Sequence, residues 1–282
     1  MIGIISDSTC DIPDELVQKY GITIIPHYII WGNQQYRDRV DMQPLDFYKR
    51  IVTDPDYPSS SQASIADFKK VYEEVAANGA TEIIALTVSS AMSGAFQMAS
   101  EAAKLVSVPV SVVDGKSPTM SLGWQVLTAA RARDAGMKVN QILPMLEDLK
   151  KKLVQYVAME SLEYLQKSGR IGNAVKWVGS VLKIRPLVSI NHLSGLVEPA
   201  SLSRTHKGVI DLMYRKFFEH FKGKEKLHVA VMHGNIPEEA EKLAERIRQE
   251  FNPAELIINI TGPVLGISTG PAAMALCGYA ED

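Results

Sequence analysis

The chain has 282 residues, of which 46% are hydrophobic and 22% are charged, and its formal net charge is -2. This length is enough for one large domain or two medium ones, each with a sizeable core. Because the charge is nearly balanced and no polybasic tract occurs, no nucleic-acid partner is expected.

Short apolar runs alternate with longer amphipathic ones along the first half of the chain. This alternation is typical of parallel strands joined by helices, so an α/β fold is predicted. We expect strands at 2–5, 82–88 and 110–113, and helices at 11–20, 65–77, 91–106, 118–134 and 140–152.

Local signals support parts of this assignment. Ser64 and Asp67 have the spacing of a capping pair for the helix at 65–77. Two extended segments at 22–25 and 28–31 lead to a hairpin-like turn, and a long polar insertion is expected from there to Ser59.

The pattern restarts near residue 153, which predicts two α/β domains at 1–153 and 154–282. In the second half, strands are expected at 155–159, 185–190, 195–198, 227–232 and 255–260, the last of them closing the fold. Helices are expected up to Lys167, at 204–221, and from Pro237 onwards.

Few signals point to export or to a membrane. The two cysteines, Cys10 and Cys277, are expected to be reduced, buried thiols. The N-terminus lacks a basic lead, and no run of about 18 apolar residues occurs. A cytoplasmic location is therefore expected.

Three hydroxyl-rich segments each have the pattern of a loop that leads into a helix. They are Ser59–Gln62, Ser89–Gly94 and Ser268–Pro271. A helix start offers unpaired backbone N–H groups and a partial positive charge, so added hydroxyl donors favour a small anion there. Asp7-Ser8-Thr9 also follows a strand, where open α/β sheets bind ligands, although a helix N-cap is the favoured interpretation of this segment taken alone.

The absence of nucleotide-binding motifs restricts the kind of anion that is expected to bind. Neither a phosphate loop with its lysine nor a dinucleotide-binding glycine turn occurs, so a carboxylate or a single phosphate fits better than a nucleotide. No cofactor and no metal are expected, because the histidines are scattered and no His-Glu-x-x-His motif occurs. A hydrolase or phosphotransferase with Ser61 or Ser93 as nucleophile remains the alternative, although no histidine is marked as its base. A small-molecule sensor is a weaker third reading.

A second requirement is apolar lining for the rest of a ligand. The segment 171–182 mixes large aliphatic residues with small ones, so an apolar slot along it and a plain core helix are both open. Arg170 and Arg204 are the cations that we expect to face a site.

Several short motifs, in one order along the chain, resemble the DegV family of fatty-acid-binding proteins. The matching pieces are Asp7-Ser8-Thr9, Ser60-Ser61-Gln62-Ala63-Ser64, Ser89-Ser90-Ala91-Met92-Ser93-Gly94-Ala95-Phe96-Gln97, Ser168-Gly169-Arg170-Ile171, Ile184-Arg185-Pro186, Arg204-Thr205-x-Lys207 and the segment from Gly262 to Pro271. Each piece is weak alone, but the set covers nearly the whole length.

The resemblance implies two α/β domains with one long-chain fatty acid in a tunnel at their interface. Ser61 and Ser93 match hydroxyls that hold the carboxylate, with Gly94 behind the second loop. Ser268, Thr269, Arg170 and Arg204 complete the expected fatty-acid site. The protein would be a carrier rather than an enzyme: it would present the acid to a separate ATP-dependent fatty-acid kinase for phospholipid synthesis, and transient contact with a membrane is allowed.

Two positions depart from the family pattern. Ser268 stands where the family usually has a histidine, which predicts weaker binding of the anionic head group and puts phosphoryl transfer in question. Ala63 replaces a usual proline, which would loosen the loop before the helix at 65–77.

Overall fold

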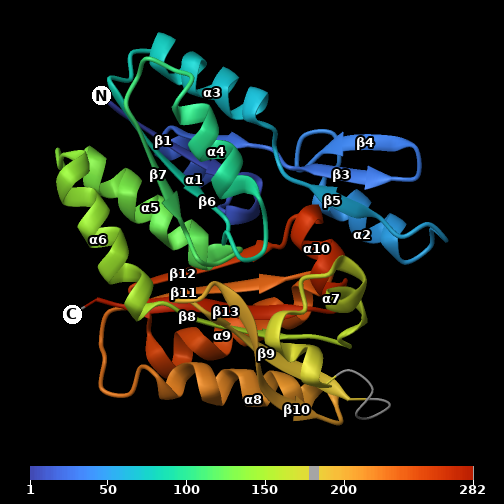
Figure 1. The fold of residues 1–282 in the computed structure, drawn as a ribbon. Coiled ribbons are helices and arrows are strands. Elements are labelled where there is room, and N and C mark those ends of the chain that lie inside the picture. The colour runs from blue at the N-terminus through green and yellow to red at the C-terminus, as the bar shows by residue number, and fades with distance from the viewer. Residues whose placement is uncertain (178–183, 282) are drawn as a thin grey trace.

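The computed structural model describes residues 1–177 and 184–281, and it contains three β-sheets (Figure 1). The first sheet is wholly parallel, in the order β2-β1-β6-β7. Its strands are β1 (Ile2–Asp7), β2 (Ile22–Ile25), β6 (Glu82–Thr87) and β7 (Val110–Asp114). Strands β1 and β6 are almost fully buried, because the central strands of a parallel sheet are covered on both faces.

Helices flank this sheet. They are α1 (Asp14–Lys19), α3 (Ile65–Ala77), α4 (Ala95–Ala103) and α5 (Met120–Asp134), and α6 (Val139–Lys152) packs on α5 and contacts β13. The predicted capping box of α3 is confirmed: the Ser64 hydroxyl accepts from the Asp67 N–H, and the Asp67 carboxylate accepts from the Ser64 N–H. Helix α4 begins at Ala95, four residues later than predicted, because residues 91–94 form the turn that precedes it.

Helix α5 is buried on both of its sides. It contacts β1 and β6 of the first sheet and also β13 of the second half of the chain. The Trp124 indole N–H donates to the Cys277 carbonyl at 3.2 Å, and Arg131 pairs with Glu255 at 2.7 Å. Figure 1 shows α5 between the two large sheets.

The segment predicted as a polar insertion is in fact structured. It forms a small antiparallel sheet in the order β4-β3-β5, with β3 (Tyr28–Trp31), β4 (Gln34–Arg37) and β5 (Ser59–Ser61), together with α2 (Pro44–Ile51). The predicted hairpin-like turn after Trp31 is confirmed, and it leads into β4, a strand that was not predicted. Phe47 and Tyr48 are fully buried and pack with Val264 and Ile267 of α10 (Pro263–Thr269). With eight residues, α2 is shorter than the run of roughly 11 or more residues over which helical periodicity is normally recognised in a sequence.

The second large sheet is mixed and has the order β10-β9-β8-β13-β11-β12. Its strands are β8 (Val154–Ala158), β9 (Arg185–Asn191), β10 (Leu196–Ser203), β11 (Leu227–His233), β12 (Glu255–Ile260) and β13 (Met274–Ala280). Helices α8 (His206–Glu219) and α9 (Pro237–Phe251) cover one face, where α8 packs on β8 to β10 and α9 on β11 and β12.

The prediction that 255–260 is the last strand is wrong. Strand β13 follows it, lies in the middle of the sheet and runs antiparallel to both β8 and β11. All seven of its residues are buried. Its Ala275 and Gly278 lack the bulk that marks a strand in sequence, so its pairing depends on the neighbours rather than on its own residues.

The strands of the first two sheets all precede residue 115, and those of the six-stranded sheet all follow residue 153. The exact domain boundary stays a prediction, because α5 packs against both halves. Within the ranges described above, no helix has the length and hydropathy needed to cross a bilayer.

Candidate functional site

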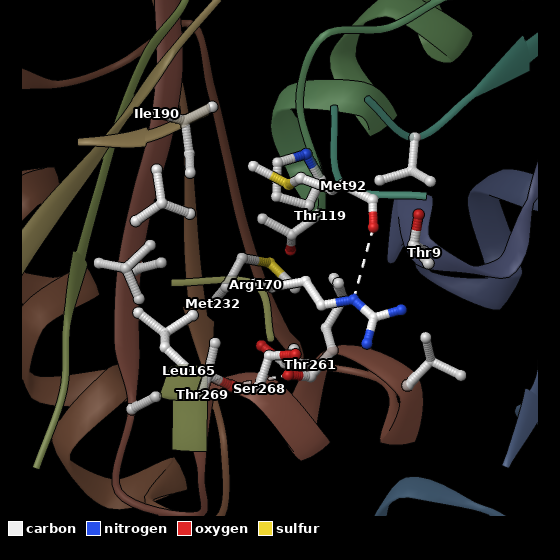
Figure 2. Close-up of a pocket in the computed structure, with 18 of the residues that line it drawn as sticks. Thr9, Met92, Thr119, Leu165, Arg170, Ile190, Met232, Thr261, Ser268 and Thr269 are labelled. Carbon is white, nitrogen blue, oxygen red and sulfur yellow. Dashed lines mark hydrogen bonds between the residues drawn. The ribbon is translucent and has the colours of Figure 1, made fainter. Parts of the chain in front are cut away.

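A cavity with an empty volume of about 960 Å³, its open mouth included, lies between the loops of the first half and the six-stranded sheet. Its lining divides by origin. Most polar residues come from the first half and from α10, whereas the largest group of aliphatic residues comes from the strands of the six-stranded sheet (Figure 2).

The aliphatic wall follows from strand alternation. Six of its side chains are Val157, Val188, Ile190, Val197, Met232 and Met274. Along β9, Val188 and Ile190 face the cavity side, whereas Leu187 joins the core under α8 and α9. Figure 2 shows Ile190, Leu165 and Met232 along this part of the cavity.

The predicted apolar slot along 171–182 is not found in the part that the structure describes. Residues 172–177 form a short 3₁₀ helix, η2 (Gly172–Trp177), and none of the residues 171–177 belongs to the cavity lining. Residues 178–182 lie outside the described residues. The apolar surface is supplied by the sheet instead.

Ser93 and Gly94 lie where the second hydroxyl loop meets α4. The Ser93 hydroxyl oxygen accepts from the Ala95 N–H at 3.2 Å, and Gly94 is the N-cap of α4. The Ser93 O–H is thus left to donate into the cavity that it lines. This loop is the one of the three that leads directly into a helix, as predicted.

Ser61 is the last residue of β5, where it pairs with Tyr28, and it also lines the cavity. Its hydroxyl donates to the Gln62 carbonyl at 3.4 Å, a long bond that a ligand can replace. The first hydroxyl segment is therefore a strand, and α3 starts only at Ile65. Gly94 is not in the lining, but a Cβ there would lie 3.2 Å from the Gln62 Nε2 atom, so the two serine loops meet at this point.

Ser268 and Thr269 line the cavity from the end of α10, not from the start of a helix. The prediction that Ser268–Pro271 leads into a helix is wrong, because β13 follows it. The partial charge at a helix end is negative, so these two hydroxyls act without help from a helix dipole. The Thr269 O–H already donates to the Leu265 carbonyl at 3.1 Å.

The two predicted arginines have different places. Arg170 lines the cavity, half-buried, and among the described lining residues it is the one charged at neutral pH. Its Nε donates to the Met92 carbonyl at 3.4 Å and its Nη1 to the Ser168 carbonyl, and Figure 2 shows its guanidinium turned toward the side where Thr9 lies. Arg204 is exposed, next to the N-cap Thr205 of α8, and the structure does not bring it to the cavity.

The Asp7-Ser8-Thr9 segment contains both a helix cap and a residue that lines the cavity. Asp7 caps the 3₁₀ helix η1 (Ser8–Cys10), since its Oδ1 accepts from the Thr9 N–H at 3.0 Å and from the Thr9 hydroxyl at 2.5 Å. Its Oδ2 accepts from the Val88 N–H at 2.7 Å. Asp7 is thus a structural cap, whereas Thr9 lines the cavity.

Thr119 also lines the cavity, and sequence reasoning missed it. Its φ of +51° is rare for a β-branched residue, and strain of this kind gathers at functional sites. Its N–H donates to the Thr9 carbonyl at 2.8 Å, and its hydroxyl to Asp11 at 2.8 Å. Asp11 in turn accepts from the Gly262 N–H at 2.9 Å, and burial raises the pKa of Asp11 to about 6 although the nearby Arg39 charge lowers it. This carboxyl joins the two halves at the cavity wall.

His27 was missed as well. It lies between β2 and β3, it is 2% exposed, and it lines the cavity. Burial lowers the pKa of its imidazole although the neighbouring Asp7 raises it. The only signal in the sequence is the Pro26-His27 break between two apolar runs, which by itself indicates a bend. An imidazole therefore reaches this cavity even though Ser268 replaces the expected one.

Among the described residues, no three or more His, Cys, Asp or Glu side chains form a group that could hold a metal ion. The two cysteines are free and buried, and burial raises the pKa of each thiol to about 12. What the cavity offers is a set of neutral hydroxyls and one guanidinium beside an aliphatic wall. That combination suits an amphipathic acid.

Comparisons with known proteins agree in sequence and in fold. A family model described as the uncharacterised DegV family matches residues 1–281. A DegV domain-containing protein of Staphylococcus aureus is 30% identical over 273 residues, which cover 97% of this chain and 96% of that protein. The solved structure of DegV, a fatty acid binding protein from Bacillus subtilis, matches with a TM-score of 0.92 at 27% identity and covers 99% of each chain. A DegV family protein from Thermus thermophilus, whose structure is described by its fatty acid binding, matches with a TM-score of 0.91 at 26% identity over 99% of each chain. The predicted α/β fold class and the resemblance seen in the sequence are confirmed.

Proposed function

The chain belongs to the DegV family, and we propose that it binds one long-chain fatty acid in the cavity between its two large sheets. The acyl chain lies along the aliphatic wall, and the carboxylate lies among Ser61, Ser93 and Arg170. The observation that carries this proposal is the division of one cavity into an aliphatic wall and a set of hydroxyls with a single cation.

Magnitudes assign different roles to the two ends of the ligand. Burying about 14 methylenes at about 0.8 kcal/mol each contributes on the order of 11 kcal/mol before costs. Ordering the ligand and removing its translational freedom takes away several of these. A hydrogen bond to the charged carboxylate adds about 1.5–3 kcal/mol. The tail therefore supplies most of the affinity, and the head fixes orientation and selects an acid.

Lipid analysis tests the proposal. The protein is purified from cells, its mass is measured under native conditions, and bound lipid is extracted and identified. We expect one fatty acid per chain, or uptake of added palmitate by the delipidated protein. An empty protein that also ignores palmitate and oleate would refute the proposal.

We further propose that the bound acid is presented to a separate ATP-dependent fatty-acid kinase, which phosphorylates the carboxylate for phospholipid synthesis. The support is family membership together with the half-buried position of Ser61, Ser93 and Arg170. Incubation of the palmitate-loaded protein with such a kinase and ATP should yield acyl phosphate. Loading from liposomes would test the transient membrane contact that lipid exchange requires.

The alternative, a serine-dependent hydrolase, finds less support in the geometry. Among the described residues, no histidine nitrogen is hydrogen-bonded to the hydroxyl of Ser61 or Ser93, and His27 Nδ1 is engaged by the Ala63 N–H. Covalent labelling of Ser93 by a serine-directed phosphonate would reverse this preference.

A further inference from the structure

The imidazole of His27 is buried at the cavity with one nitrogen unused. Its Nδ1 accepts from the Ala63 N–H at 3.2 Å. Its Nε2 is fully buried and has no hydrogen-bond partner within the described part of the chain. An unpaired buried donor is expensive, so such a group calls for an explanation.

The Ala63 N–H fixes the protonation of the ring. A nitrogen that accepts a hydrogen bond cannot also carry a proton, so the hydrogen of the neutral imidazole is on Nε2. Protonation of the ring would place a second N–H against the Ala63 N–H. Burial also disfavours the charged ring. The result is a neutral donor of fixed tautomer.

The protein itself does not satisfy this donor. The closest acidic oxygen is Oδ2 of Asp7, at 3.7 Å from Nε2, which is too long for a hydrogen bond. Both Asp7 oxygens already accept hydrogen bonds, Oδ1 from the Thr9 N–H and hydroxyl and Oδ2 from the Val88 N–H. The backbone N–H of His27 donates to the Ser8 hydroxyl oxygen at 3.1 Å, which holds the main chain at this residue.

The ring also lies among the polar lining residues. Its Nδ1 partner Ala63 follows Ser61 and Gln62, both of which line the cavity, and Thr9 follows the Asp7 that faces the ring. The ring thus stands where the hydroxyls of two segments meet.

We propose that His27 is a specificity-determining residue whose Nε2–H donates to the head group of the ligand. The inference rests on the proposed function, because it takes the ligand to be a carboxylate. A carboxylate accepts such a bond more strongly than a hydroxyl does, so His27 favours acids over alcohols and esters of the same length. The donor is neutral, so its contact persists across the pH range in which an ordinary histidine loses its charge.

Two substitutions separate the two ring nitrogens. In His27→Asn the amide oxygen takes the place of Nδ1 and keeps the Ala63 bond, but no donor reaches the position of Nε2. In His27→Gln the amide N–H₂ reaches that position. Dissociation constants for palmitate and for hexadecanol are measured by calorimetry on delipidated wild type and both variants, and thermal unfolding checks the fold.

We expect His27→Asn to weaken palmitate binding roughly 10- to 100-fold, the factor that one hydrogen bond to a charged group supplies. Hexadecanol binding should change by less than about threefold, and His27→Gln should recover most of the palmitate affinity. Unchanged palmitate binding by His27→Asn, or equal losses for palmitate and hexadecanol, would overturn the inference while leaving the proposed function in place. Wild-type protein that binds neither ligand would instead refute the proposed function.

If neither variant folds, ¹⁵N NMR of the unaltered protein decides. The expected result is a proton on Nε2 of His27 with and without palmitate, and a shift of the Nε2 resonance when palmitate is added. A proton on Nδ1, or resonances that palmitate does not move, would overturn the inference.

Discussion

Replacing Ser93 by alanine tests the head-group site most directly. The Ser93 hydroxyl lines the cavity, and its oxygen is already occupied by the Ala95 N–H at 3.2 Å. The proton of the Ser93 hydroxyl therefore remains available for a hydrogen bond to a ligand. Losing one hydrogen bond to a carboxylate removes about 1.5–3 kcal/mol of binding free energy. Ser93→Ala should therefore weaken palmitate binding by roughly 12- to 150-fold.

The same change should affect folding only slightly. The Ala95 N–H loses its acceptor at the beginning of α4, which lowers the free energy of unfolding by about 0.5–1.5 kcal/mol. The melting temperature should fall by only a few degrees. If the variant were much less stable than this, its weaker binding would reflect partial unfolding rather than a lost contact with the ligand.

Ser90→Ala is a matched control from the same loop. Ser90 is exposed, its hydroxyl accepts from Lys116 Nζ at 3.3 Å, and it is not in the cavity lining. Calorimetric titrations with palmitate and hexadecanol should show a loss for the acid in Ser93→Ala and no loss for either ligand in Ser90→Ala. A loss of equal size for the acid and the alcohol in Ser93→Ala would show that Ser93 does not contact the carboxylate.

Two further predictions concern the wall and the stability of the fold. Ala275 of β13 lines the cavity, so Ala275→Leu should shift the preferred ligand toward shorter acids, measured by competition among saturated acids of increasing length; an unchanged length preference would place the chain elsewhere. Burial raises the pKa of Asp38 to about 7, although its bond from the Ser8 hydroxyl at 2.7 Å lowers it, so the folded state holds a proton that the unfolded chain releases near pH 4. Stability should therefore fall as the pH rises from about 4 to 7, and urea unfolding across this range should show a shallower fall for Asp38→Asn; identical slopes for the two proteins would contradict the assignment.

The parts of the fold that the sequence predicts are those with local signals. The α3 cap needs only Ser64 and Asp67, and the strands of the parallel sheet are continuous apolar runs. Strand β13 has no such signal: a Cβ at Gly278 would lie 2.4 Å from the His228 carbonyl, so this glycine is required by close strand packing that no local pattern reveals. Likewise, Ser59–Ser61 is a strand because it pairs with β3, not because serines favour strands.

The candidate site was predictable only in part. Ser61, Ser93 and Arg170 were found because short motifs resemble a family, and the structure brings all three to one cavity. The physical argument from helix starts holds for Ser93 alone, since Ser61 ends a strand and Ser268 lies near the end of α10. His27 and Thr119 could not be found, because burial and backbone strain become visible only when distant segments are placed together.

The double-sided burial of α5 limits how a lipid can reach the interior. If the two large sheets moved apart, Trp124 would lose its ring contacts with His228 and Tyr279, and burial of a large apolar side chain contributes roughly 1.5–3 kcal/mol. The Arg131–Glu255 pair would break in the same movement. We therefore expect a ligand to enter and leave through small displacements of the loops at the rim of the cavity, while the two halves stay in contact. The rate of ligand exchange should respond to substitutions in these rim loops rather than to substitutions along α5.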